Sequence, residues 1–137
     1  MSQPFPTEGM ELTHILVVAD VDRAVHFYRD VLGAELVRQY GGTSAVFSFA
    51  GAWLLLVTGG EPTADKPDVT FATIDAPDRV SHAMTIRVPD GQAAYETLRS
   101  RGAEFLTPPV VSEWEVRAFF RDPDGHLLEI SEARSGS

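Results

Sequence analysis

The sequence predicts an α+β fold in which two β-α-β-β-β modules form a curled mixed sheet around a ligand cleft, with the helices on the outer face. The first observation behind this prediction is an internal duplication. Residues 16–36 read LVVADVDRAVHFYRDVLGAEL and residues 86–105 read IRVPDGQAAYETLRSRGAEF. Both segments start as an apolar strand that ends in Val-x-Asp, and both end in Gly-Ala-Glu. We therefore expect one domain, with a first module at about 11–58, a connector at 59–80 and a second module at about 81–133.

The second observation is a helical pattern that follows the first strand of each module. Asp20 and Asp90 are good N-cap residues, because a carboxylate oxygen can accept from the free amides of the first helical turn. Gly33 and Gly102 stand where a left-handed C-terminal cap is favoured. In the first module an apolar stripe repeats at helical spacing, and the second module has a weaker one. The first stripe consists of Val21, Ala24, Val25, Tyr28, Val31 and Leu32.

Three short strands are predicted after each helix, because apolar and β-branched runs alternate there with glycine-containing turns. The segment Asp122-Pro123-Asp124-Gly125 is a strong turn signal, since proline presets φ and glycine takes the left-handed position. A short strand is also possible in the connector, at 69–74. The predicted strands are residues 35–40, 43–50 and 53–58 in the first module, and 104–106, 115–121 and 127–132 in the second.

Composition excludes several classes of function. The 137 residues are 44% hydrophobic and 23% charged, which is typical of a globular protein. A net charge of −9 without a basic stripe argues against binding to nucleic acid. No apolar run approaches the length of a membrane span, so we predict a cytoplasmic protein without a membrane partner. Because cysteine is absent, any metal would need histidine or carboxylate ligands.

Three segments resemble the vicinal oxygen chelate superfamily, which includes glyoxalase I, extradiol dioxygenases, and fosfomycin- and bleomycin-resistance proteins. They are residues 13–18 (THILVV), 22–33 (DRAVHFYRDVLG) and 120–129 (FRDPDGHLLE). The resemblance covers about residues 11 to 133. It implies a divalent metal (Fe, Mn, Ni or Zn) inside the curled sheet, which chelates neighbouring oxygens of a substrate or activates dioxygen.

His14, His82 and Glu129 are the metal ligands that the resemblance suggests, because two histidines and one carboxylate suit non-haem iron. Glu129 falls on the family's ligand position, and it is also the candidate catalytic base. In relatives the other ligands stand seven residues before the helix-starting aspartate, which gives Thr13 and Ala83 here. A one-residue shift places a strand side chain on the other face, unless a bulge restores the phase.

The predicted cleft offers further candidates for substrate binding: Phe47, Phe49 and Trp114 as an aromatic wall, and Arg117 as a partner for a substrate carboxylate. His126, directly after the turn, is expected to be exposed. The chain lacks the fourth glyoxalase I ligand, because Leu55 stands near that place. Three interpretations remain open. The first is a metal-dependent lyase, isomerase or dioxygenase, and the second is a metal-free protein of the bleomycin-resistance type that sequesters a drug or metabolite. The third is a metal-free scaffold without a catalytic residue. A homodimer is expected.

Overall fold

The two halves of the chain have the same topology in the computed structural model, which describes residues 4–134. In the first sheet the strand order is β1-β4-β3-β2, and β1 runs parallel to β4. The three strands predicted after the first helix are present, with small changes at their ends. The strands of this sheet are β1 (Thr13–Val18), β2 (Glu35–Tyr40), β3 (Ser44–Phe49) and β4 (Ala52–Thr58).

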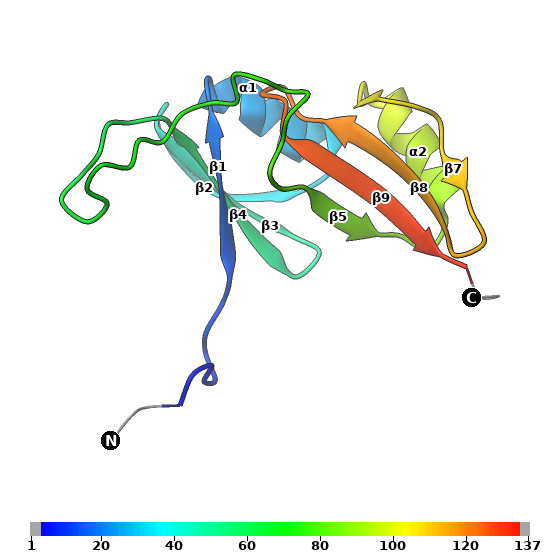
Figure 1. The fold of residues 1–137 in the computed structure, drawn as a ribbon, viewed down its shortest axis with the longest axis horizontal. Coiled ribbons are helices and arrows are strands. Elements are labelled where there is room, and N and C mark those ends of the chain that lie inside the picture. The colour runs from blue at the N-terminus through cyan, green and yellow to red at the C-terminus, as the bar shows by residue number, and fades with distance from the viewer. Residues whose placement is uncertain (1–3, 135–137) are drawn as a thin grey trace.

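The second sheet repeats this order as β5-β9-β8-β6, with β5 parallel to β9. The short strand β7 pairs with β8 and has no counterpart in the first sheet or in the sequence prediction. The two sheets lie side by side with the helices on one face (Figure 1), which confirms the predicted α+β architecture. The strands are β5 (Met84–Arg87), β6 (Glu104–Phe105), β7 (Val110–Val111), β8 (Glu115–Arg121) and β9 (Leu127–Ala133).

Each helix begins where the sequence predicts. The carboxylates of Asp20 and Asp90 accept hydrogen bonds from backbone amides of the first turns of α1 (Val21–His26) and α2 (Gly91–Ser100). The first helix continues as one π-helical segment, η1 (Phe27–Val31). Beyond the two helical stretches, Gly33 and Gly102 adopt positive φ values of 85° and 103°, a conformation that glycine reaches without steric cost.

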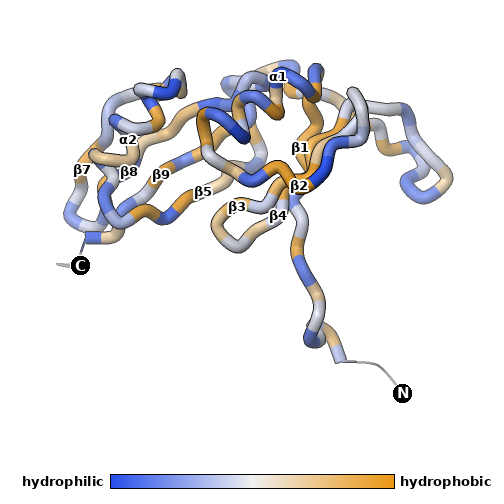
Figure 2. The backbone as a smooth tube through the Cα atoms, turned by 180° about the vertical axis from the view of Figure 1, so that it is seen from behind, coloured by the Kyte–Doolittle hydropathy of each residue, from blue (hydrophilic) through white to orange (hydrophobic). Residues whose placement is uncertain are grey.

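The core lies between the helices and the sheet faces that they cover. In both sheets alternate strand residues point into it, and Figure 2 shows the apolar backbone positions following the strands. In the middle, the ring of Phe27 lies 6.5 Å from that of Phe120, and the ring of Tyr28 lies 6.0 Å from that of Phe47. One apolar core therefore joins both modules.

Polar contacts from one turn fasten the second module to the first. This turn, residues 122–125, connects β8 to β9 and reaches across to the start of α1. The Tyr28 hydroxyl donates to Asp122 at 2.7 Å, and the Ala19 amide donates to Asp124 at 2.8 Å. The Asp-Pro-Asp-Gly sequence is thus both a hairpin turn and the polar part of the interface between the modules.

The connector has little regular structure. The segment 69–74 does not form the strand considered from the sequence, and its one ladder contact is an isolated bridge between Gly60 and Phe71. Before β1, residues 4–12 project away from the body of the fold (Figure 1). No helix among residues 4–134 is long and apolar enough to cross a membrane.

Candidate functional site

The face of the second sheet that points away from the helices carries the main polar candidate, Glu129. Leu128 and Ile130 are each 1% exposed and pack in the core beneath α2. Because strand side chains alternate between faces, Glu129 and Ser131 point to the other side. The strand phase predicted from the sequence is thus present in the structure.

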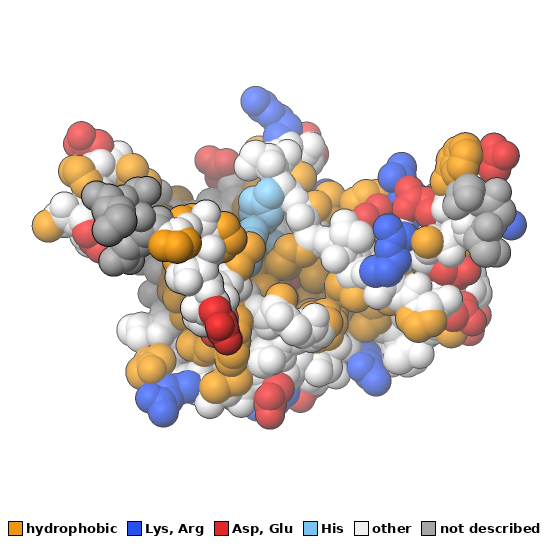
Figure 3. Space-filling view, turned by 90° about the horizontal axis from the view of Figure 1, so that it is seen from below, with side chains coloured by type: hydrophobic (Ala, Val, Ile, Leu, Met, Phe, Trp, Pro, Cys, Tyr) orange, Lys and Arg blue, Asp and Glu red, His pale blue; other side chains and the backbone are white. Residues whose placement is uncertain are grey.

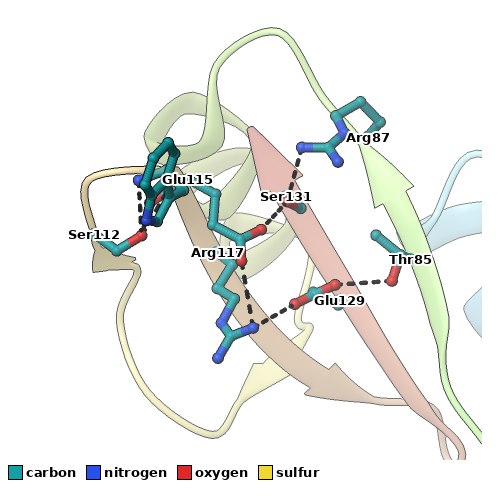
Figure 4. Close-up of polar contacts among 8 residues, drawn as sticks. Thr85, Arg87, Ser112, Glu115, Arg117, Glu129 and Ser131 are labelled. Atoms are coloured by element: carbon teal, nitrogen blue, oxygen red, sulfur yellow. Dashed lines mark hydrogen bonds and ion pairs between the residues drawn. The ribbon is translucent and has the colours of Figure 1, made fainter. Parts of the chain in front are cut away.

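Glu129 is held by neighbouring strands on both sides. The Thr85 hydroxyl on β5 donates to Glu129 Oε1 at 2.8 Å, and a guanidinium nitrogen of Arg117 on β8 lies 3.9 Å from Oε2 (Figure 4). The glutamate is only 8% exposed, whereas Thr85 and Arg117 are exposed. A nearly buried carboxylate with one committed oxygen and one loosely paired oxygen can accept a hydrogen bond or a proton from a ligand.

A second layer of polar contacts continues along the same face. The Ser131 hydroxyl donates to Glu115 at 2.6 Å and accepts from Arg87 at 3.1 Å. Arg117 lies 3.4 Å from Glu115, so its guanidinium is shared between two carboxylates (Figure 4). The sequence prediction missed Thr85, Arg87 and Glu115. Polar residues two apart on one strand share a face, as Thr85 and Arg87 do on β5 and Glu115 and Arg117 do on β8. This spacing could have indicated the polar face, but only once the strand pairing was known.

His14 and His82 come together, but on a different side from Glu129. Their ring centroids are 5.0 Å apart. His14 alternates with the buried core residues Leu16 and Val18, so its side chain lies on the helix-facing side of β1. Burial, followed by the neighbouring imidazoles of His82 and His126, lowers the pKa of His14 below its ordinary value. The ligand position on the open face of β1 is occupied by Thr13, as counting back from Asp20 suggests.

His126 joins this group of imidazoles, contrary to the prediction that it would be exposed. It is 5% exposed, and its ring stacks on that of His82 with a centroid separation of 6.0 Å. One ring nitrogen, Nε2, lies 2.8 Å from the carbonyl oxygen of Val17. The other, Nδ1, is buried and has no hydrogen-bond partner within the described part of the chain. The prediction was wrong because the turn before His126 docks on the first module and carries the ring inward.

The residues present do not fit the metal set that the resemblance implies. His14 faces the helices, whereas Glu129 faces the open side of its sheet and is hydrogen-bonded to Thr85. Within the described residues, no group of three or more histidine, aspartate or glutamate side chains is placed to hold a metal ion. The structure thus brings the two histidines together but leaves the glutamate apart from them.

The aromatic candidates are distributed over three environments. Phe47 is fully buried in the core against Tyr28, so it cannot contact a ligand as expected. Phe49 is half-buried and lines an apolar pocket between the modules. Trp114 is 60% exposed, in the segment before β8. Of the four predicted substrate-binding residues, Arg117 is the one that contacts Glu129.

Comparison with known proteins agrees with the fold described above. The family model of the Glyoxalase/Bleomycin resistance protein/Dioxygenase superfamily matches residues 11–130. Metallothiol transferase FosB from Shouchella clausii is 34% identical over 117 residues, covering 82% of this chain and 73% of that protein. Lactoylglutathione lyase from Haemophilus influenzae is 31% identical over 134 residues, covering 92% of this chain and 95% of that protein.

Among solved structures, a mutant form of the fosfomycin resistance protein FosX from Listeria monocytogenes, complexed with Mn(II) and 1S,2S-dihydroxypropylphosphonic acid, has the same fold. Its TM-score is 0.69 at 18% identity, and the match covers 94% of this chain and 93% of that one. Three observations point to the same family. They are the duplicated topology, the position of Glu129 after the Asp-Pro-Asp-Gly turn, and the match of the family model over residues 11–130. The chain belongs to the Glyoxalase/Bleomycin resistance protein/Dioxygenase superfamily.

Proposed function

We propose that this protein binds a small organic molecule on the open face of the second sheet, with Glu129 as the principal polar anchor and without a metal held by His14 and His82. The observation that carries the proposal is the position of Glu129, nearly buried, hydrogen-bonded to Thr85 and close to Arg117. A buried carboxylate is costly unless it is paired or used, and a guanidinium at 3.9 Å satisfies it only loosely. A ligand with a cationic or hydrogen-bond-donating group would complete its contacts.

We also propose that a second copy of the chain supplies the other wall of this site, as a homodimer. In the first sheet, the open face carries apolar side chains that neighbour one another across three strands: Ile15 pairs with Leu55, and Leu55 pairs with Val46. Ile15 is 45% exposed, and the other two are half-buried. An apolar sheet face left uncovered favours association, and the polar face around Glu129 would then border an enclosed cavity.

A metal-dependent enzyme is the second candidate, and sequence similarity favours it. The relatives that match at 31% and 34% identity are a lyase and a transferase. In this case Glu129 would bind Fe, Mn, Ni or Zn, and it would first have to leave the hydroxyl of Thr85. A bound ion would act as a Lewis acid towards an oxygen-bearing substrate. The residues around Glu129 favour binding over this alternative, because the two histidines lie on another face.

One set of purified variants separates the two candidates. Wild type, Glu129→Gln and the exposed control Glu113→Gln are prepared without chelator, assayed for bound metals, and screened by thermal shift against a panel of amines, antibiotics and metabolites. If the protein binds its ligand without a metal, we expect well below one equivalent of metal per chain. We also expect a ligand-dependent rise in Tm that Glu129→Gln abolishes and Glu113→Gln keeps. One equivalent of metal that disappears in Glu129→Gln would instead contradict the metal-free proposal and support the metal-dependent alternative.

The dimer is tested separately by sedimentation. We expect a mass near twice the 15.0 kDa of one chain, and a shift towards the monomer in Ile15→Glu. A wild-type mass near that of one chain would contradict the shared site. The cytoplasmic location and the lack of a nucleic-acid or membrane partner stay predictions from composition.

A further inference from the structure

A second, apolar site lies between the two modules, along β5. It is a pocket of about 450 Å³, within the range of roughly 300–1,000 Å³ that is common for small-molecule sites. All its lining residues are apolar except His14, Thr85 and Arg87. We call it the intermodule slot. Its walls include Leu32, Phe49 and Leu54 from the first module and Met84, Ile86 and Leu128 from the second. Figure 3 shows hydrophobic side chains in the hollow between the two halves, next to histidine.

The slot runs along an unpaired strand edge. Among the strands of the described chain, β5 pairs with β9 alone, and all four of its residues, Met84–Arg87, line the slot. The amide of Val88 donates to the Ser131 carbonyl of β9. Because backbone groups alternate in direction along a parallel strand, those of Thr85 and Arg87 point away from β9, towards the free edge. The slot is therefore apolar in its walls and offers backbone hydrogen-bonding groups along one side.

Its charge is opposite to that of the whole protein. The chain has a net charge of −9, yet among residues 4–134 no acidic side chain lines the slot, and Arg87 is the only arginine or lysine that does. In the described contacts the Arg87 guanidinium makes one hydrogen bond, at 3.1 Å to the neutral hydroxyl of Ser131. A guanidinium has five donors arranged to bind a carboxylate through two parallel bonds. Arg87 thus has most of its donors available at the edge of an apolar pocket.

We propose that the intermodule slot binds a small apolar molecule with one carboxylate, whose head pairs with Arg87 and whose apolar body lies between the two modules. This site is distinct from the proposed Glu129 face, because Glu129 is not among its lining residues. Thr85 and Arg87 are shared by both: the Thr85 hydroxyl is turned to Glu129, and the Arg87 guanidinium donates to Ser131 beside Glu129 on β9. The slot would select apolar anions, whereas the Glu129 face would select cations or donors.

Straight-chain amphiphiles provide the probe, and Trp53 provides the signal because it lines the slot. The chain has two tryptophans, so Trp114→Phe leaves Trp53 as the sole fluorophore of this kind. In this background, hexanoate, octanoate, octylamine and 1-octanol are titrated by fluorescence and calorimetry. We expect saturable binding, an increase in affinity of about fourfold per methylene group, and octanoate at least about tenfold tighter than octylamine.

Variants then assign the binding to the slot. Arg87→Gln should remove the preference for octanoate over octylamine while 1-octanol binds as before. The control Arg99→Gln, an exposed position on α2, should leave every affinity unchanged. Ala52→Phe, which narrows the slot, should weaken all four probes. Thermal melts verify that each variant is folded.

The outcomes are distinguishable from those of the Glu129 site. Glu129→Gln should bind octanoate with wild-type affinity even if it loses the ligand of the open face. Equal affinities of wild type for octanoate and octylamine would overturn the anion preference. Persistence of that preference in Arg87→Gln, or no saturable binding of any probe, would overturn the site itself.

Discussion

The hydroxyl of Tyr28 donates a 2.7 Å hydrogen bond to the carboxylate of Asp122, and both residues are buried although 94 positions separate them. The bond links the first helix to the turn before the last strand. Burial raises the pKa of Asp122 above its ordinary value, and the Tyr28 hydrogen bond acts in the opposite direction. Burial, reinforced by Asp122, raises the pKa of Tyr28 well above its ordinary value, so the hydroxyl keeps its proton. Tyr28 thus supplies a permanently protonated donor to a buried carboxylate at the junction of the modules.

Tyr28→Phe should reduce the free energy of unfolding by about 1–3 kcal/mol at neutral pH, because it leaves a buried carboxylate oxygen without its donor. The folded-state pKa of Asp122 lies above its unfolded value, so its contribution favours folding when protonated and is lost as pH rises through the folded pKa. The variant raises that pKa further. The penalty should therefore shrink as pH falls towards the ordinary range of aspartate.

Urea unfolding of wild type and Tyr28→Phe from about pH 4 to 8 checks this, because the range begins near the ordinary pKa of an aspartate and extends above it, in the direction of the shift. Tyr40→Phe is the matched control, because Tyr40 is an exposed tyrosine on β2. A penalty for Tyr28→Phe that stays constant over the whole range would contradict the assigned role of Asp122.

Asp124→Ala should destabilise the fold much more than Arg23→Gln, although the two residues form one ion pair at 3.1 Å. The Asp124 side chain is 2% exposed and also accepts from the Ala19 amide, so its loss removes a buried acceptor that holds both Ala19 and Arg23, at about 1–3 kcal/mol. The Arg23 side chain is 51% exposed, and its removal should cost below about 1 kcal/mol. Chemical denaturation of both variants measures the difference, and equal losses would show that the ion pair dominates.

Thr85→Val should destabilise the protein by about 1–3 kcal/mol, because valine keeps the shape but removes the donor to Glu129 Oε1. Thr85→Ser keeps the hydroxyl and should restore most of the loss. The two variants should also differ in affinity for any ligand that raises the wild-type Tm through Glu129. Thr85→Val should bind that ligand more weakly, and Thr85→Ser should bind it nearly as tightly as wild type. If Thr85→Val binds that ligand as tightly as wild type, Thr85 does not position the glutamate.

Two adjacent glycines in the connector should respond differently to alanine. A Cβ at Gly59 would lie 2.6 Å from the backbone oxygen of Phe71, whereas a Cβ at Gly60 would meet nothing within 4 Å. Gly59→Ala must displace the backbone and should cost about 1–3 kcal/mol, while Gly60→Ala should be close to neutral. Thermal melts of both variants provide the measurement, and similar Tm values would indicate that residues 59–71 readjust freely.

The local features were predictable because each depends on neighbouring residues. The caps at Asp20 and Asp90 and the positive φ at Gly33 and Gly102 follow from the residue types at helix ends. The phase of Glu129 follows from alternation, since Leu128 and Ile130 must point together into a core. The strand β7 was missed because two residues carry no periodic pattern.

The sequence by itself determined the duplicated βαβββ pattern, its helix boundaries and the side of β9 on which Glu129 lies. The tertiary structure decided which face of each other strand is covered: it buried Phe47 in the core, turned His14 towards the helices, and drew His126 inward beside His82. The physical reason is that alternation defines two faces of a strand without saying which one a helix will cover. That choice is made by packing between residues far apart in the chain, such as Tyr28 and Asp122.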